Sequence, residues 1–212
     1  MTWVKICGIT TVDDALACVE AGADAIGLNF WPRSKRHRPP DELYEMGRAL
    51  ATQPRRIERW GVFVDPTAEE IEAAFAAGAI DVAQLHGDED PTLCTRLGAR
   101  AVKALRLAGI HSLAEFDRYP GDRFLIDAPF AGYGGSGQLV DEQLAHQATL
   151  HAAPRRIILA GGLDPDNVAG VIARVRPHGV DVASGVEARP GVKDHERVRR
   201  FVAAAKGQRS VP

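Results

Sequence analysis

Short apolar runs alternate with amphipathic stretches along the whole chain. The apolar runs are nearly continuous, as expected of strands that are buried on both faces of a sheet. In the stretches between them, apolar residues recur every three or four positions, which predicts helices with one buried face. We expect strands near residues 3–7, 24–30, 57–64, 81–85, 101–105, 123–127, 156–160 and 180–184. We expect helices near residues 12–21, 40–52, 67–77, 89–97, 112–118, 139–150, 165–175 and 194–206.

This alternation predicts parallel strands that are joined by crossover helices. Such units close naturally into a (β/α)8 TIM barrel, so we expect an α/β fold in which residues 1–212 form a single domain. An open, doubly wound sheet is the alternative. It is less favoured, because no GxGxxG motif follows the first strand and no GxxxxGKS/T motif occurs in the sequence.

Two local patterns refine this expectation. Glycines follow four of the expected helices, and we expect each to end its helix in the left-handed conformation: Gly22, Gly78, Gly98 and Gly179. The segment 110–118 is so short that its helix is expected to be short or irregular. The glycine-rich run 132–137 stands between a strand and a helix, which favours an active-site loop over a flexible spacer.

Composition narrows the function classes. The chain has 26 Lys and Arg against 28 Asp and Glu, so nothing global indicates nucleic acid or an anionic membrane as a partner. No apolar run reaches the length of a membrane span, and no secretory signal is recognised. The three cysteines, at positions 7, 18 and 94, form no CxxC pair. This argues against a disulfide framework or a zinc site and favours the reducing cytoplasm.

The carboxyl ends of barrel strands are where such folds carry their chemistry. Cys7 ends the first strand there, although a buried core cysteine is the alternative. Cys18 and Cys94 fall on apolar helix positions and are expected to pack. Asp65 precedes a helix start and is expected to cap it, whereas Asp127 has no such structural role. His86 is expected either to line the pocket or to be a structural histidine.

Glycines at two strand ends favour a phosphate site. A phosphate needs close approach to backbone N–H groups, and barrels often build this site after strands seven and eight. The residues at those places are Gly161, Gly162, Ser184 and Gly185, and the loop glycines Gly134, Gly135 and Gly137 could close over them. Ordinary turn glycines are the alternative for either pair alone.

The loop after the second strand carries a dense basic cluster, residues 33–38. It is too short and isolated to favour nucleic acid. At a barrel mouth, an arginine is suited to hold a substrate carboxylate through two parallel hydrogen bonds.

Taken together, these motifs resemble the phosphoribosylanthranilate isomerase family of tryptophan biosynthesis. The resemblance runs along nearly the whole chain and is carried by VKICGIT at 4–10, SKR at 34–36, GVFV at 61–64, QLHG at 84–87, AGGL at 160–163, GVDV at 179–182, SGVE at 184–187 and PGVKD at 190–194. A departure is Gly135-Ser136-Gly137 followed by Leu139, where the family commonly has Gly-Thr-Gly and an aromatic pair.

The resemblance implies an Amadori rearrangement of N-(5-phospho-β-D-ribosyl)anthranilate without cofactor or metal. It implies that Cys7 is the general base, Asp127 the general acid and Arg36 the ligand of the anthranilate carboxylate. Lys5 points to the same face of its strand as Cys7, and we count it with His86 and the phosphate-site residues as substrate-binding. The expected partner is this small phosphosugar, bound by a monomer or a homodimer.

Two other functions remain open. A histidine-pathway aminoaldose isomerase would use paired aspartates, so Cys7 favours the tryptophan branch. A non-catalytic barrel that binds a phosphorylated metabolite as a sensor or scaffold would keep the glycine sites. It would have no need for a thiol beside an acid.

Overall fold

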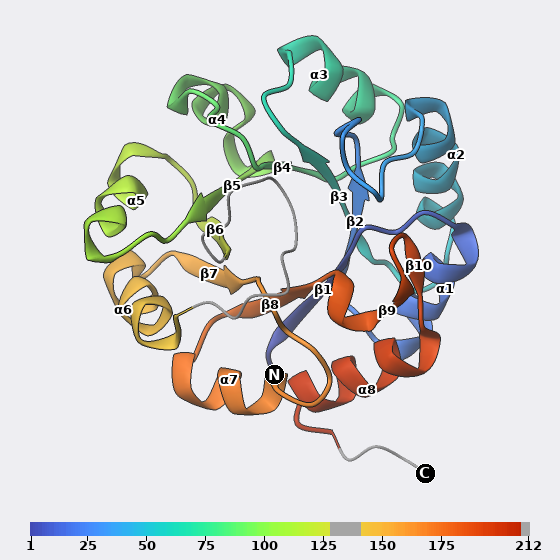
Figure 1. Cartoon of the computed structure of the whole chain (residues 1–212). Helices are drawn as coiled ribbons and strands as arrows, with labels where there is room; N and C mark the ends of the chain where they lie inside the picture. The colour runs from blue at the N-terminus through green and yellow to red at the C-terminus, as the bar shows by residue number, and fades with distance from the viewer. Residues whose placement is uncertain (128–140, 209–212) are drawn as a thin grey trace.

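The computed structural model describes residues 1–127 and 141–208. In this part of the chain, strands β1 to β8 pair in chain order, every pair is parallel, and β8 pairs with β1 to close a barrel (Figure 1). The strands are β1 (Trp3–Cys7), β2 (Ala25–Asn29), β3 (Glu58–Phe63), β4 (Val82–Leu85), β5 (Ala101–Arg106), β6 (Arg123–Asp127), β7 (Arg156–Leu159) and β8 (Gly179–Val182). The predicted (β/α)8 fold class is confirmed.

Helices surround the barrel (Figure 1). They are α1 (Val12–Ala21), α2 (Pro40–Ala51), α3 (Ala68–Ala76), α4 (Pro91–Leu97), α5 (Glu115–Arg118), α6 (Glu142–Ala152), α7 (Val168–Val175) and α8 (His195–Ala205). The fifth helix is short, as expected, and follows a 3-10 turn at Ile110–Ala114. None of the helices in the described ranges is long and apolar enough to cross a membrane.

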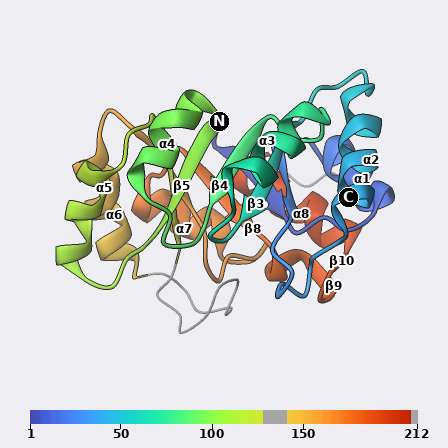
Figure 2. The same ribbon diagram turned by 90° about the horizontal axis from the view of Figure 1, so that it is seen from above.

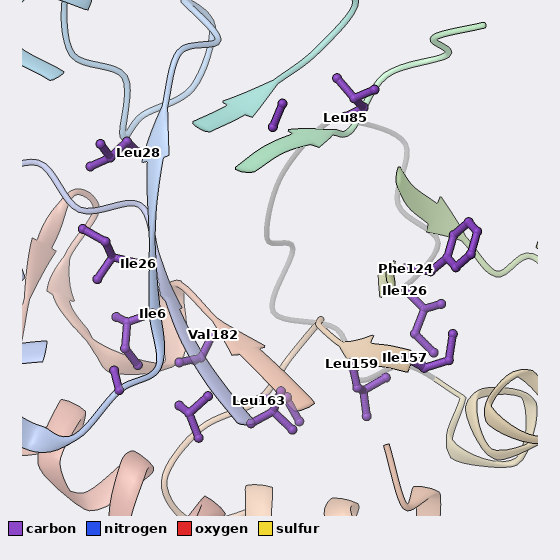
Figure 3. Packing of buried hydrophobic residues seen from close by; sticks show 14 of the residues in the cluster. Ile6, Ile26, Leu28, Leu85, Phe124, Ile126, Ile157, Leu159, Leu163 and Val182 are labelled. Carbon is purple, nitrogen blue, oxygen red and sulfur yellow. The ribbon is translucent and has the colours of Figure 1, made fainter. Parts of the chain in front are cut away.

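Alternation of side chains along each strand builds two apolar layers. In β2, Ile26 and Leu28 point away from the barrel centre, as do Phe124 and Ile126 of β6 on the opposite side (Figure 3). This outer layer packs against the helices. The inner layer fills the barrel itself and contains Trp60, Val102, Leu125 and Ile158, all fully buried. The side chains of Lys5 and Cys7 share the inward face of β1, because successive residues of a strand point to opposite sides.

Of the four glycines that were expected to end helices in the left-handed conformation, Gly22 does so, with φ 92° and ψ 22°, and Gly78 follows α3 with a φ of 66°. Gly98 follows α4 with a φ of 59°, but its ψ of −134° lies outside the left-handed helical region, so the prediction for Gly98 is wrong. The prediction for Gly179 is wrong, because α7 ends earlier, with Arg176 at a φ of 57°. Gly179 begins β8 instead, and a Cβ there would lie 2.9 Å from the Trp3 side chain.

A hairpin that the sequence did not predict lies between β8 and α8. A 3-10 turn (Ser184–Val186) is followed by β9 (Glu187–Arg189) and the antiparallel β10 (Val192–Lys193). The hairpin lies at the end of the barrel opposite the N-terminus (Figure 2). The Thr10 hydroxyl donates a hydrogen bond to the Gly191 carbonyl, which fastens the hairpin to the loop after β1. Residues from this hairpin therefore reach the carboxyl end of the barrel.

Candidate active site

A cavity of about 810 Å³ opens at the carboxyl ends of the strands. It brings together most of the described residues that the sequence analysis singled out: Cys7, Arg36, His86, Asp127, Gly161, Gly162 and Ser184. Lys5 and Gly185 do not line it. Gly134, Gly135 and Gly137 lie outside the described residues.

Cys7 is the last residue of β1 and its thiol faces the cavity. Gly27 of β2 makes room for it, since a Cβ at that position would lie 2.7 Å from Cys7 Sγ. Burial raises the pKa of the Cys7 thiol, whereas the cations Lys5 and Lys193 act in the opposite direction. The thiolate is therefore disfavoured by its surroundings as a whole and favoured by its two lysine neighbours. Cys18 and Cys94 are buried among apolar residues, as expected.

Lys5 lies beneath the cavity rather than on its wall. Its side chain is fully buried, and Nζ donates a hydrogen bond of 2.9 Å to Asp181 Oδ1. Nζ also lies 5.4 Å from the centre of the Trp60 ring. Burial alone would lower the pKa of Lys5, but Asp181 and Cys7 raise it overall. This position does not support direct contact between Lys5 and a substrate, so its expected substrate-binding role stays a prediction.

His86 and Asp127 meet across the barrel mouth. Asp127 ends β6, and its Oδ2 lies 3.5 Å from His86 Nε2. The other ring nitrogen, Nδ1, lies 3.1 Å from Gln84 Nε2. Gln84 is almost fully buried, and its Oε1 has no hydrogen-bond partner among the described residues. The carboxyl group and the imidazole therefore form one polar group on the cavity wall.

The loop after β4, which carries His86, is held by a buried ion pair that the sequence analysis missed. Lys103 Nζ lies 2.7 Å from Glu89 Oε2, and both side chains are nearly inaccessible to solvent. Lys103 Nζ also donates to the Gly87 carbonyl at 2.6 Å, and Glu89 Oε1 accepts from the Gly87 N–H at 2.9 Å. The pair thus binds both backbone groups of the residue that follows His86.

The expected capping role of Asp65 is wrong. Helix α3 begins at Ala68, so its first turn is capped by Thr67, which accepts from the Glu70 N–H in a capping box. The Asp65 side chain instead accepts a hydrogen bond of 2.7 Å from the Asp88 N–H. It therefore ties the loop after β3 to the loop after β4.

The loops after β7 and β8 contact each other at the expected phosphate site. Gly161 and Gly162 have φ angles of 95° and 65°, a region that favours glycine. Gly185 is packed against the other loop, because a Cβ there would lie 1.9 Å from the Leu163 carbonyl oxygen. Gly161, Gly162 and Ser184 line the cavity together. Exposed backbone at two adjoining loops is suited to hold an anion.

Arg36 also lines the cavity and is paired with Glu187. Its Nε and Nη2 donate to the two carboxylate oxygens at 2.7 and 2.8 Å. These bonds raise the pKa of Arg36. Burial alone would raise the pKa of Glu187, but Arg36 and Lys193 lower it overall. The SGVE and PGVKD motifs contained Glu187 and Lys193, yet nothing in the sequence indicated that either contacts Arg36.

A closed parallel barrel with a thiol and a carboxyl group on the wall of one cavity defines an enzyme of the (β/α)8-barrel class. The sequence profile of the N-(5'-phosphoribosyl)anthranilate (PRA) isomerase family matches residues 4–204. The chain belongs to this family and is an isomerase of tryptophan biosynthesis.

Relatives and solved structures agree with this membership. The N-(5'-phosphoribosyl)anthranilate isomerase of Magnetococcus marinus is 47% identical over 204 residues, which cover 96% of this chain and 94% of the relative. The phosphoribosyl anthranilate isomerase structure from Thermotoga maritima is 39% identical with a TM-score of 0.86, over 98% of this chain and 100% of that chain. Another structure of this enzyme, in complex with reduced 1-(o-carboxyphenylamino)-1-deoxyribulose 5-phosphate, is 36% identical with a TM-score of 0.83, over 98% of this chain and 100% of that chain.

Proposed function

We propose that the chain converts N-(5-phospho-β-D-ribosyl)anthranilate into 1-(2-carboxyphenylamino)-1-deoxy-D-ribulose 5-phosphate, with Cys7 as general base and Asp127 as general acid. The observation that carries the proposal is that both residues line the one cavity at the carboxyl ends of the strands. The ligand of a related isomerase, reduced 1-(o-carboxyphenylamino)-1-deoxyribulose 5-phosphate, is the reduced form of the proposed product.

The reaction needs one acid and one base. Asp127 donates a proton to the ribose ring oxygen, the bond from C1′ to that oxygen breaks, and the anthranilate nitrogen forms a Schiff base with C1′. Cys7, as thiolate, then removes the proton from C2′, and the electron pair moves through C1′ to neutralise the nitrogen. The resulting enolamine tautomerises to the ketone, so that the atoms of substrate and product are the same. General acid and general base catalysis each supply typically 10²–10⁴-fold in rate.

Charged groups of the wall match the two anionic ends of this substrate. Arg36 would bind the anthranilate carboxylate, and the backbone at Gly161, Gly162 and Ser184 would bind the phosphate. Gly185 does not line the cavity but lets the loop after β8 pack against the loop after β7, and its expected contact with the phosphate stays a prediction. His86 contacts Asp127 and lies where it would orient the acid or the substrate. We expect Gly134, Gly135 and Gly137 to complete the phosphate site.

The proposal includes the setting in which the enzyme works. We propose that it acts as a monomer or a homodimer. We propose that residues 1–212 act as one domain, without cofactor, nucleic acid or membrane as a partner. The free thiols at Cys7, Cys18 and Cys94 fit the reducing cytoplasm.

A fluorescence assay with freshly generated phosphoribosylanthranilate tests the proposal. We expect the wild-type protein to remove substrate fluorescence faster than spontaneous hydrolysis does. Cys7→Ala and Asp127→Asn should each reduce this rate by about 10²–10⁴-fold. The control variant is Asp122→Asn, which changes the residue just before β6, at the other end of that strand from Asp127.

The outcomes separate the alternatives. Absence of turnover by the wild-type protein, with the reduced product analogue still bound, would favour the non-catalytic sensor or scaffold. If the Cys7→Ala variant still turns over the substrate at the wild-type rate, the chain is an isomerase but the Cys7 thiol is not its general base.

A further inference from the structure

Of the two donor edges of the Arg36 guanidinium, one is occupied by a carboxylate of this chain. The guanidinium can bind a carboxylate through Nε and Nη2 or through the two Nη atoms. Glu187 occupies the first edge, with both distances below 3 Å. In the described part of the chain, Nη1 makes no hydrogen bond, and 13% of the side chain remains exposed on the cavity wall. The edge formed by Nη1 and Nη2 is therefore the one available to a ligand.

The stem of Arg36 is fixed as well as its head. The backbone of Gly8 lies against it, so that a Cβ at position 8 would be 2.2 Å from Arg36 Cδ. The Gly8 backbone thus limits movement of the Arg36 stem, and the hydrogen bonds to Glu187 limit rotation of the guanidinium.

Glu187 is itself anchored on several sides. Its Oε1 accepts from Lys193 Nζ at 3.1 Å and from the Gly191 N–H at 3.3 Å. Lys193 Nζ also donates to the Ala183 carbonyl at 3.0 Å, and its N–H donates to Asp14 on α1. The β9–β10 hairpin thus holds a carboxylate in a fixed position behind the arginine.

Two cations share this single carboxylate, because both Arg36 and Lys193 contact Glu187. Arg36, Lys193 and Glu187 together carry a net positive charge, which attracts a further anion. The free edge of Arg36 determines where that anion would bind. We propose that Glu187 is a specificity-determining residue. By holding one edge of Arg36, it turns the other edge toward the cavity and makes the enzyme select substrates with a carboxylate on the aromatic ring. The inference rests on the proposed function, in which Arg36 binds that carboxylate.

Binding of two matched compounds tests this role. One is reduced 1-(o-carboxyphenylamino)-1-deoxyribulose 5-phosphate, and the other is the same molecule without its carboxyl group. The measured quantity is the ratio of their dissociation constants, obtained by titration calorimetry. A substitution with a purely structural effect would weaken the binding of both compounds equally and leave this ratio unchanged.

We expect the wild-type protein to prefer the carboxylated compound by about 10- to 100-fold, the range of a charge-assisted bidentate contact. In Glu187→Gln, the side-chain amide would face Arg36 Nη2 with its own N–H, so the guanidinium must turn. The ratio should then fall by about tenfold or more, while affinity for the carboxyl-free compound changes by less than about threefold. Glu42→Gln is the control, since it removes the partner of the neighbouring Arg38 on the protein surface.

Each other outcome overturns the proposal in a recognisable way. An unchanged or larger ratio in Glu187→Gln means that Glu187 is irrelevant to the ligand or competes with it for Arg36. A wild-type ratio near one means that Arg36 does not recognise the carboxylate. If neither compound binds to the wild-type protein, the proposed function itself is wrong. Should Glu187→Gln fail to fold, Glu187→Asp keeps the charge but withdraws it by one methylene, and the same ratio decides.

Discussion

Lys5 and Asp181 are direct neighbours across the seam where the barrel closes. They are paired in the register of β1 and β8, and their side chains form an ion pair of 2.9 Å inside the barrel. Cys7 follows two residues later on the same face of β1, and Lys5 is the strongest influence that lowers the pKa of its thiol. Closure of the barrel therefore places a buried charge pair directly under the thiol.

Lys5→Met should make Cys7 less reactive. Without the cation, the pKa of the thiol rises further, and the unpaired Asp181 carboxylate acts in the same direction. We expect alkylation by iodoacetamide at pH 8 to be several-fold slower than in the wild-type protein, because only the thiolate reacts. The other cysteines do not interfere, since burial raises the pKa of Cys18 to about 12 and that of Cys94 to about 11.

Lys206→Met is the matched control for this experiment. It removes a lysine that pairs with Asp24 at 2.8 Å, far from the cavity, so the alkylation rate of Cys7 should stay unchanged. Equal rates in Lys5→Met and the wild-type protein would contradict the electrostatic role of Lys5.

The alternation of apolar runs and amphipathic stretches was sufficient to predict the barrel. It also predicted the last residue of three strands, Cys7, Leu85 and Asp127, and placed the other strand ends within one or two residues. Cys7 and Asp127 do line the same cavity. Their catalytic roles remain predictions. The sequence pattern predicts the barrel because each strand–helix unit repeats the same two signals, a strand that is apolar on both faces and an amphipathic helix.

Contacts between distant residues could not be predicted in the same way. Lys5 and Asp181 are 176 positions apart, and Arg36 and Glu187 are 151 positions apart. A sequence pattern indicates that a charge is buried but not which charge it meets. The β9–β10 hairpin escaped detection because strands of three and two residues are too short for periodicity. Asp65 was misinterpreted because Thr67, two residues later, is the better cap.

Lys103→Met should loosen the loop that carries His86. The substitution leaves the Glu89 charge buried without its partner, which costs about 3–5 kcal/mol in comparable pairs. It also removes the hydrogen bond to the Gly87 carbonyl. We expect a lower free energy of unfolding in urea and a lower kcat/KM, because the imidazole beside Asp127 is no longer held in place.

The double variant Lys103→Met/Glu89→Gln distinguishes charge from packing. Glutamine keeps an oxygen that accepts from the N–H groups of Gly87 and Asp65, but it carries no charge. The double variant should therefore be more stable than Lys103→Met alone, as measured in a double-mutant cycle. Additive losses would mean that the ion pair itself is unimportant.

Asp81→Asn should weaken the other end of the barrel in a pH-dependent way. The hydrogen bonds from Arg59 outweigh the effect of burial and lower the pKa of Asp81. A lowered pKa adds stability that is complete above the pKa of the unfolded chain, about 3.9, and is lost as the pH falls through the folded value. We expect Asp81→Asn to lower the free energy of unfolding by about 3 kcal/mol at pH 7 and at pH 5. Below about pH 3.9, the difference between the variant and the wild-type protein should become smaller.

Urea unfolding at several pH values measures this difference. Glu196→Gln is the control, because Glu196 and Arg199 are both more than half exposed and their pair should contribute less than about 1 kcal/mol. A loss for Asp81→Asn that stays constant down to pH 3 would contradict the assignment to its ionised form.

Gly8→Ala should damage the active site as well as stability. Gly8 has a φ of 76°, and an added Cβ would lie 2.2 Å from Arg36 Cδ. Gly78→Ala is the matched control, since Gly78 has a φ of 66° but no atom within 4 Å of the added Cβ. Both variants should lose about 1–2 kcal/mol to backbone strain in urea unfolding. Only Gly8→Ala should raise KM, because it displaces the arginine that is expected to bind the substrate carboxylate. Equal KM values in the two variants would show that Arg36 does not depend on its contact with Gly8.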